Sequence, residues 1–221
     1  NEDLALKQAL FRTVTALANS DTIITSNSST FGISSIAAGL SNPGRFFGLH
    51  FFMPAHLVPL VEIVASEHAN LDIAEKIKLA LIPIGFEPVT VRKDVPGFLA
   101  NRIQAAMMRE VWNILDRDIA TAEDVDKAVM YGFGCRFLAA GPIMQKEISG
   151  LDVTHSASKN LFPDLNNDAV PPAMLTQKIE KGEMGMKTQQ GFWAWTPESI
   201  EENRKKYVKK LRAAIEILSD D

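Results

Sequence analysis

The sequence predicts an α/β domain over residues 1–93, followed by an all-α domain over residues 94–221. Up to residue 92, stretches with helical periodicity alternate with short apolar strands, which is typical of α/β domains. Beyond Pro96 nearly every pattern has helical spacing. The run KDVPGF at 93–98 contains the turn formers proline and glycine and separates the two patterns. We therefore expect one boundary at this run.

The α/β region begins with a helix predicted over residues 2–18 and a short strand over 22–25. The strand leads into SNSST at 26–30, and a short helix follows through Ile33 and Ala37. Polar side chains at the carboxyl end of a strand build binding crevices in open α/β sheets. They can equally cap the helix that follows. The local pattern leaves both interpretations open.

Residues 46–62, FFGLHFFMPAHLVPLVE, contain the titratable pair around which the chain is organised. His50 lies in one apolar run, two prolines interrupt the chain, and Glu62 closes the next run. If the second run folds back beside the first, Glu62 can accept a hydrogen bond from one imidazole nitrogen. The other nitrogen could then exchange a proton with a substrate. A histidine among aromatic residues can also be an ordinary core residue.

The remaining elements are mostly helical. A helix is predicted from Asn70 to Ile84 with Gly85 as its stop, and a strand starts at Pro88. The later helices are predicted at 97–117, 121–132, 143–161, 171–181 and 197–218. The helix at 97–117 has two apolar faces, so we expect it to be central to its domain. Asn101 lies on one face and either ties the two domains together or points into a site.

Composition excludes several functional classes. With 46% hydrophobic and 23% charged residues, the 221-residue chain has a globular composition. A net charge of −4 gives no electrostatic footprint for nucleic acid or an anionic membrane, and we expect neither partner. No signal peptide or apolar run of membrane-spanning length is visible. The single cysteine, Cys135, and the lack of zinc-like Cys and His spacing predict a reducing, cytoplasmic location and no metal.

Several common catalytic motifs do not occur in the sequence. Neither GxGxxG nor the Walker pattern is present, so no phosphate-binding loop can be assigned. The patterns GxSxG and HExxH are also missing from the sequence, which gives no support to a serine hydrolase or a zinc protease.

Five motifs occur in the order seen in L-3-hydroxyacyl-CoA dehydrogenases, and the resemblance covers essentially the whole chain. They are SNSST at 26–30, GLHFF at 48–52, LVE at 60–62, DVPGFLANR at 94–102 and MKTQQGFW at 186–193. The resemblance implies the distal part of a Rossmann-type NAD-binding domain followed by a helical dimerisation domain. It also implies a homodimer that interconverts 3-hydroxyacyl-CoA and 3-ketoacyl-CoA by hydride transfer, within fatty acid metabolism.

The resemblance also implies roles for individual residues. His50 resembles the family's catalytic histidine, and Glu62 the carboxylate that orients it. Ser28 resembles a serine that touches both the substrate oxygen and the nicotinamide. Asn101 matches an asparagine that lies over the reacting carbonyl.

Three further positions resemble contacts to NAD. Glu2 and Lys7 match a pair in the first helix, and Lys187 matches a lysine near the C-terminus that also reaches the cofactor. Together with Ser28 they form the expected cofactor-binding set.

The sequence departs from the family pattern in two ways. The family's glycine-rich phosphate loop is expected before residue 1. Met53 stands where these enzymes usually have asparagine, and His56 adds a polar group in the same loop. The substrate could therefore be a non-CoA hydroxy acid, or the alcohol of a small carboxylated compound. The remaining alternative is a non-catalytic dimeric relative with a structural role.

Overall fold

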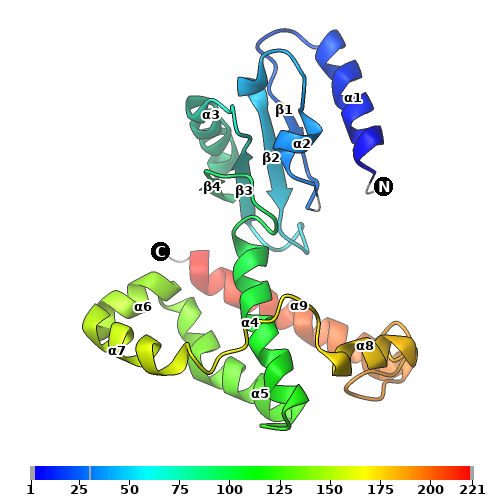
Figure 1. Ribbon diagram of the computed structural model, residues 1–221, viewed down its shortest axis with the longest axis vertical. Coiled ribbons are helices and arrows are strands. Elements are labelled where there is room, and N and C mark those ends of the chain that lie inside the picture. The colour runs from blue at the N-terminus through cyan, green and yellow to red at the C-terminus, as the bar shows by residue number, and fades with distance from the viewer. Residues whose placement is uncertain (1–2, 30, 220–221) are drawn as a thin grey trace. The chain divides into compact units, whose positions relative to one another are not determined.

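The computed structural model describes residues 3–29 and 31–219, and its contacts divide the chain into two units, residues 1–104 and 105–221 (Figure 1). The first unit is α/β and the second is helical, which confirms the predicted fold class. The boundary predicted after residue 93 stays a prediction. The division between the two units falls inside one helix, which begins before residue 104 and ends after it.

The first unit contains a four-stranded sheet in the order β1-β2-β3-β4. Strands β1 and β2 are parallel, β2 and β3 are antiparallel, and β3 and β4 are parallel. The carboxyl ends of β1 and β2 therefore lie at the same edge of the sheet. The elements are α1 (Leu4–Leu17), β1 (Ile24–Ser26), α2 (Ile33–Ile36), η1 (Pro43–Arg45), β2 (Phe46–Phe51), β3 (Leu60–Ala65), α3 (Leu71–Leu81), η2 (Ile82–Ile84) and β4 (Glu87–Val91).

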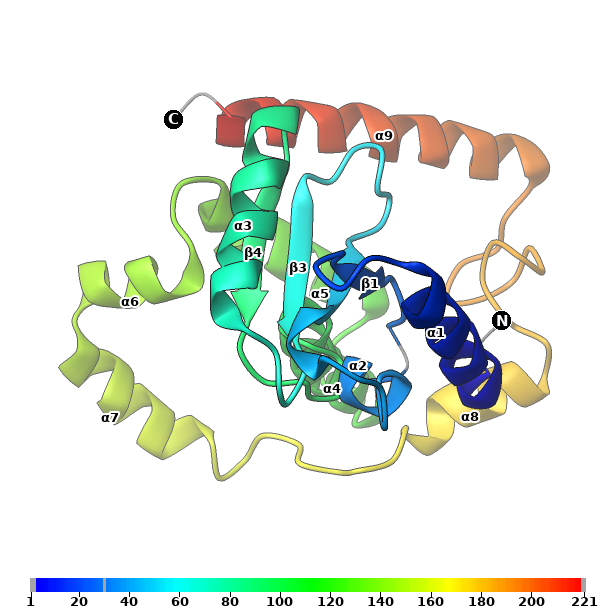
Figure 2. The ribbon, with the colours of Figure 1, turned by 90° about the horizontal axis from the view of Figure 1, so that it is seen from above.

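Helices cover both faces of this sheet, with α1 and α2 on one side and α3 on the other (Figures 1 and 2). Successive strand residues point to opposite faces, so Phe46 packs in the α1 and α2 layer and Phe47 in the α3 layer. Each ring is fully buried, which contributes about 1.5–3 kcal/mol relative to exposure. Side chains on β2 and β3 thus form both layers of the core.

Gly48, between Phe46 and His50 on β2, is required by close packing. A Cβ atom added there would lie 2.9 Å from the Cβ of Val64, which is too close for two carbon atoms. Strands β2 and β3 therefore approach closely just beside His50.

Side-chain caps and glycines set the helix ends. Asn70 caps α3 by accepting a hydrogen bond from the backbone nitrogen of Asp72 at 2.9 Å. Gly85 ends the following turn with φ 87°, which agrees with its predicted role as a stop.

The second unit consists of helices and the loops that connect them. They are most of α4 (Ala100–Asp116), then α5 (Ala122–Ala128), η3 (Val129–Gly134), η4 (Cys135–Leu138), α6 (Pro142–Ser149), α7 (Leu151–Leu161), α8 (Ala173–Glu180) and α9 (Pro197–Ser219). Thr121 caps α5 by accepting a hydrogen bond from the backbone nitrogen of Asp124 at 3.1 Å. The single helix predicted over 143–161 is wrong, because Gly150 has φ 92° and separates α6 from α7.

Apolar side chains in the second unit are largely exposed. Helix α4, which lies wholly within the described residues, has no buried side chain, and Met107 in its second-unit part is 37% exposed. The expected burial of this helix is therefore not found within the chain itself. Several large apolar side chains outside α4 are exposed as well: Ile143, Ile148, Val153, Leu161 and Phe162. Along residues 3–29 and 31–219, no helix has both the length and the apolar character needed to cross a membrane.

Candidate active site

His50 and Glu62 form a buried pair on neighbouring strands. They stand directly opposite each other in the antiparallel register of β2 and β3, so their side chains share one face of the sheet. The Nδ1 atom of His50 lies 2.7 Å from Oε2 of Glu62. Glu62 is completely buried and His50 is 7% exposed. The hydrogen bond predicted from the sequence is present.

The second oxygen of Glu62 is held by the main chain. Oε1 accepts hydrogen bonds from the backbone nitrogens of Leu99 at 2.9 Å and Ala100 at 2.8 Å. These N–H groups precede and open α4, where the helix dipole favours a negative charge. Both oxygens are therefore partnered, as a buried carboxylate requires. The sequence interpretation missed this contact, and its only signal is the PGF turn that introduces the helix.

The hydrogen bond determines which imidazole nitrogen can act as a base. An ionised carboxylate only accepts hydrogen bonds, so Nδ1 of His50 carries the hydrogen directed at Glu62. In the neutral ring Nε2 then has a lone pair and can accept a proton. This tautomer leaves the lone pair of the neutral ring on Nε2.

Two phenylalanine rings enclose His50. Their centroids lie 6.3 Å away for Phe52 and 5.4 Å away for Phe98, and both meet the imidazole edge-on. Phe98 is buried and adopts φ 47°, a conformation that few residues other than glycine take. Sequence reasoning did not identify Phe98 as part of the site, although it belongs to the PGF motif. The rings shield the histidine from water on these sides.

The SNSST loop lies at the same edge of the sheet as His50, since β1 and β2 are parallel. The Oδ1 atom of Asn27 accepts a hydrogen bond at 3.1 Å from the nitrogen of Phe51, the residue after His50. Ser28 is buried, and its Oγ accepts from the nitrogen of Phe31 at 3.3 Å. The structure thus brings the loop of Ser28 to the histidine end of β2.

The alternative that SNSST caps the following helix is wrong. The N-cap of α2 is Gly32, which supplies no side-chain hydrogen bond. Asp94, distant in sequence, instead accepts a hydrogen bond from the nitrogen of Ser34 at 2.7 Å.

The other predicted site residues belong to different segments of the chain. Asn101 follows Ala100 in the first turn of α4 and is half-buried. Lys7 lies on α1, also half-buried. Lys187 is exposed in the second unit and lines a cavity of about 500 Å³ there. Glu2 lies outside the described residues. The roles assigned to these residues stay predictions.

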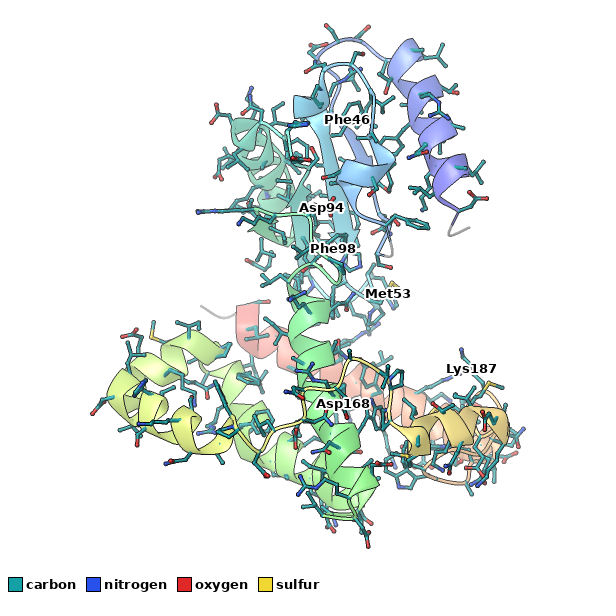
Figure 3. All side chains as sticks on the ribbon, in the orientation of Figure 1. Phe46, Met53, Asp94, Phe98, Asp168 and Lys187 are labelled. Carbon is teal, nitrogen blue, oxygen red and sulfur yellow. The ribbon has the colours of Figure 1, made fainter. Side chains whose placement is uncertain are left out.

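The loop between β2 and β3 exposes the two residues that depart from the family pattern. Met53 is 74% exposed, and the side chain of His56 is also exposed (Figure 3 labels Met53). Both positions can therefore contact a ligand without repacking of the core.

Two family models cover most of the chain. Residues 1–95 match "3-hydroxyacyl-CoA dehydrogenase, NAD binding domain", and residues 97–195 match "3-hydroxyacyl-CoA dehydrogenase, C-terminal domain".

The relatives act on different substrates. The chain is 34% identical to the 5-formyl-3-hydroxy-2-methylpyridine 4-carboxylate 5-dehydrogenase of Mesorhizobium japonicum, over 98% of this chain and 70% of that protein. It is 34% identical to the L-carnitine dehydrogenase of Oceanobacillus iheyensis, over 67% of this chain and 48% of that protein. It is 30% identical to the 3-hydroxyadipyl-CoA dehydrogenase of Escherichia coli, over 90% of this chain and 41% of that protein.

The similar solved structures also include enzymes named for substrates with and without coenzyme A. A crystal structure of the pyridine carboxylate dehydrogenase, described as an NAD+ dependent dismutase, superimposes with a TM-score of 0.93 at 32% identity, covering 99% of this chain and 71% of that chain. A 3-hydroxybutyryl-CoA dehydrogenase from Escherichia coli gives a TM-score of 0.68 at 29% identity, covering 88% of this chain and 41% of that chain.

Proposed function

The chain belongs to the 3-hydroxyacyl-CoA dehydrogenase family of NAD-dependent oxidoreductases, and we propose that it oxidises a small carboxylated substrate with His50 as general base. The observation that carries this proposal is the 2.7 Å hydrogen bond between His50 and Glu62, whose second oxygen is fixed by two backbone N–H groups. Such an arrangement leaves one imidazole nitrogen directed away from the carboxylate as a proton acceptor.

The first unit fits the nicotinamide end of NAD. A polar loop with a buried serine follows the carboxyl end of β1, the position where open α/β sheets bind nucleotides. When bound, NAD supplies the hydride acceptor. We propose that Ser28 touches the nicotinamide and that Lys7, Glu2 and Lys187 contact the rest of the cofactor.

The protein's own residues accept the proton and stabilise the charges that develop during the reaction. Nε2 of His50 takes the proton from the substrate hydroxyl, and the carbon that bears this hydroxyl loses a hydride. Glu62 stabilises the imidazolium that forms, so no unpaired charge is left in the buried site. Ser28 and Asn101 are proposed to donate hydrogen bonds to the substrate oxygen, which carries negative charge in the reverse direction.

Three observations support a substrate without coenzyme A. The relative that this chain matches over 98% of its length is named for a pyridine carboxylate. The structure of that protein superimposes with a higher TM-score than the hydroxybutyryl-CoA dehydrogenase does. Met53 also replaces the asparagine expected near the nicotinamide.

A formyl group suits the same site as a secondary alcohol. A hydrated aldehyde carries a hydrogen and a hydroxyl group on one carbon, so one base and one hydride acceptor serve both reactions. We therefore propose a small carboxylate that bears either a hydroxyl or a hydrated formyl group.

A CoA thioester is the second candidate. The observation that favours it is the 30% identity to a 3-hydroxyadipyl-CoA dehydrogenase over 90% of this chain. A role in fatty acid metabolism would follow only from this candidate.

The test is a steady-state assay of the full-length protein with NAD. Rates with acetoacetyl-CoA and NADH are compared with rates on small hydroxy acids, carnitine and aromatic formyl carboxylates. Activity confined to the small carboxylates supports the first candidate, and activity confined to the thioester supports the second. His50→Gln should lower kcat roughly 10²- to 10⁴-fold, whereas the exposed control His68→Gln should not. Unchanged turnover in His50→Gln would refute the proposed base.

We also propose that a second copy covers the exposed apolar side chains of the second unit, because large apolar patches usually mark interfaces. Light scattering of the full-length protein would give the mass of a homodimer if this is correct. The cytoplasmic location, inferred from the single cysteine, stays a prediction.

A further inference from the structure

Asp94 connects two segments that are distant in the sequence. Its Oδ2 accepts a hydrogen bond from the nitrogen of Ser34 at 2.7 Å, in the first turn of α2. The residue at the N-cap of that helix, Gly32, supplies no side-chain hydrogen bond. A carboxylate from 60 residues further along the chain therefore does the work of a local cap.

Each of the two joined segments carries part of the candidate site. The chain just before α2 contains Ser28. The chain just after Asp94 contains Phe98, whose ring encloses His50, and it continues into the N–H groups that hold Glu62 (Figure 3 labels Asp94 and Phe98). This hydrogen bond thus joins the helix that follows the Ser28 loop to the segment that leads into Phe98.

The packing at Gly32 shows that this contact is closely fitted. A Cβ atom at Gly32 would lie 2.6 Å from Oδ2 of Asp94, so no larger residue fits unless the carboxylate moves. The backbone of Gly32, with φ −60° and ψ 142°, is one that any residue adopts. The glycine is therefore required by the approach of Asp94 and not by its own conformation.

The environment of the other Asp94 oxygen indicates that the residue does more than stabilise the fold. Oδ1 is buried and has no hydrogen-bond partner in the part of the chain that the structure describes. Burying an unpaired acceptor costs folding free energy, so the residue carries a cost that a capping serine would not carry.

We propose that Asp94 is a positioning residue, which keeps the Ser28 loop and the Phe98 segment in register around the His50–Glu62 pair. This inference rests on the proposed function, because it assigns Asp94 an effect on the reaction of that site. Asp94 acts through these two segments, and it is not proposed to touch the substrate.

The first experiment compares three variants of the full-length protein. Asp94→Ala should lower kcat by roughly 10- to 100-fold, because small displacements of reacting groups are costly. Asp94→Asn keeps an acceptor for Ser34 and should recover most of that loss. The matched control is Asn70→Ala, which removes the cap of α3 and should reduce the melting temperature without changing kcat. Equal kcat values in Asp94→Ala and Asn70→Ala would overturn the inference.

The second experiment is a double-mutant cycle. Gly32→Ala should reduce kcat in the wild-type background by displacing the carboxylate, and it should have little further effect in Asp94→Ala. Additive losses would show that the two residues act separately and would overturn the inference. If Asp94→Ala does not fold, Gly32→Ala and Asp94→Asn still decide the question, because kcat should fall in the former and be largely kept in the latter.

His50→Gln separates this inference from the proposed function. If that variant keeps full turnover, the proposed function fails. If it loses turnover while Asp94→Ala and Gly32→Ala keep theirs, only the inference about Asp94 fails.

Discussion

Replacing Glu62 with glutamine tests how the carboxylate controls the histidine. The carboxylate accepts from three donors: Nδ1 of His50 and the backbone nitrogens of Leu99 and Ala100. A glutamine side chain has one oxygen acceptor and one NH₂ donor, so it cannot accept from all three. The amide oxygen can face either the two backbone N–H groups or the imidazole.

The hydrogen-bond count decides between these orientations. Each bond to a charged group contributes about 1.5–3 kcal/mol, and leaving a buried donor unsatisfied costs about 1–3 kcal/mol. Turning the amide oxygen toward His50 would leave two backbone donors without their acceptor. The oxygen should therefore stay on Leu99 and Ala100, and the NH₂ group should face Nδ1. Nδ1 must then become an acceptor, which moves the ring hydrogen to Nε2.

With the hydrogen on Nε2, the histidine lacks the acceptor nitrogen that the proposed mechanism requires. We expect kcat to fall roughly 10³- to 10⁴-fold, by analogy with the tautomer effect known for a serine protease triad. That loss corresponds to about 4–5.5 kcal/mol in the activation barrier. The assay is kcat of the full-length variant, together with ¹⁵N NMR of the imidazole to locate the ring hydrogen.

The control is Glu87→Gln, at an exposed position on β4, which should leave kcat unchanged. A Glu62→Gln variant with kcat within a factor of about 10 of the wild type, or with the hydrogen still on Nδ1, would refute the reasoning.

Three further predictions concern the packing and charges around these elements. Gly48→Ala should destabilise the protein by about 1–3 kcal/mol in urea unfolding, because its Cβ would meet Val64, and Gly44→Ala, with nearest atoms at 3.6 Å, is the control. Phe98→Ala should cost about 3–5 kcal/mol in the same measurement and also lower kcat, and full retention of both would contradict its place in the core and the site. A hydrogen bond from Lys178 at 2.8 Å lowers the pKa of Glu183, so Lys178→Met should return that pKa to its ordinary range in an NMR titration. Because the folded pKa is depressed, the stabilising effect of this pair is present at neutral pH and is lost as the pH falls through the folded pKa, and an unaltered titration curve would exclude the pairing.

The central pair could be predicted because its signal is local. Two apolar runs with alternating side chains, separated by prolines, define neighbouring strands, and a histidine and a carboxylate at facing positions follow from that pairing. The strand register then determines whether the two side chains meet, because a shift of one residue would place Glu62 on the opposite face of the sheet.

The contacts that complete the site could not be predicted in the same way. The N–H groups of Leu99 and Ala100 have no signature in the sequence, because every residue except proline has one. The bond from Ser34 to Asp94 depends on how two loops meet after folding. The local alternative, that the polar run at 26–30 caps the following helix, was plausible but wrong, because the N-cap of α2 is Gly32.

The helical region shows a different limit. Apolar periodicity in residues 143–161 correctly predicts helical structure. It does not reveal that Gly150, with φ 92°, divides this stretch into two helices. Periodicity also predicts burial of α4, yet Ile103 remains 59% exposed. An apolar face indicates that something covers it, without identifying whether that partner lies in the same chain.

The backbone hydrogen bonds to Glu62 have a consequence for protein engineering. Leu99 and Ala100 hold the carboxylate of Glu62 through their backbone N–H groups, so these two hydrogen bonds do not depend on the identity of either side chain. Leu99 is 44% exposed, which leaves space for polar or larger groups. Proline is the exception, because it would remove an N–H group. A library that randomises position 99, with proline left out, should therefore keep both N–H groups on Glu62.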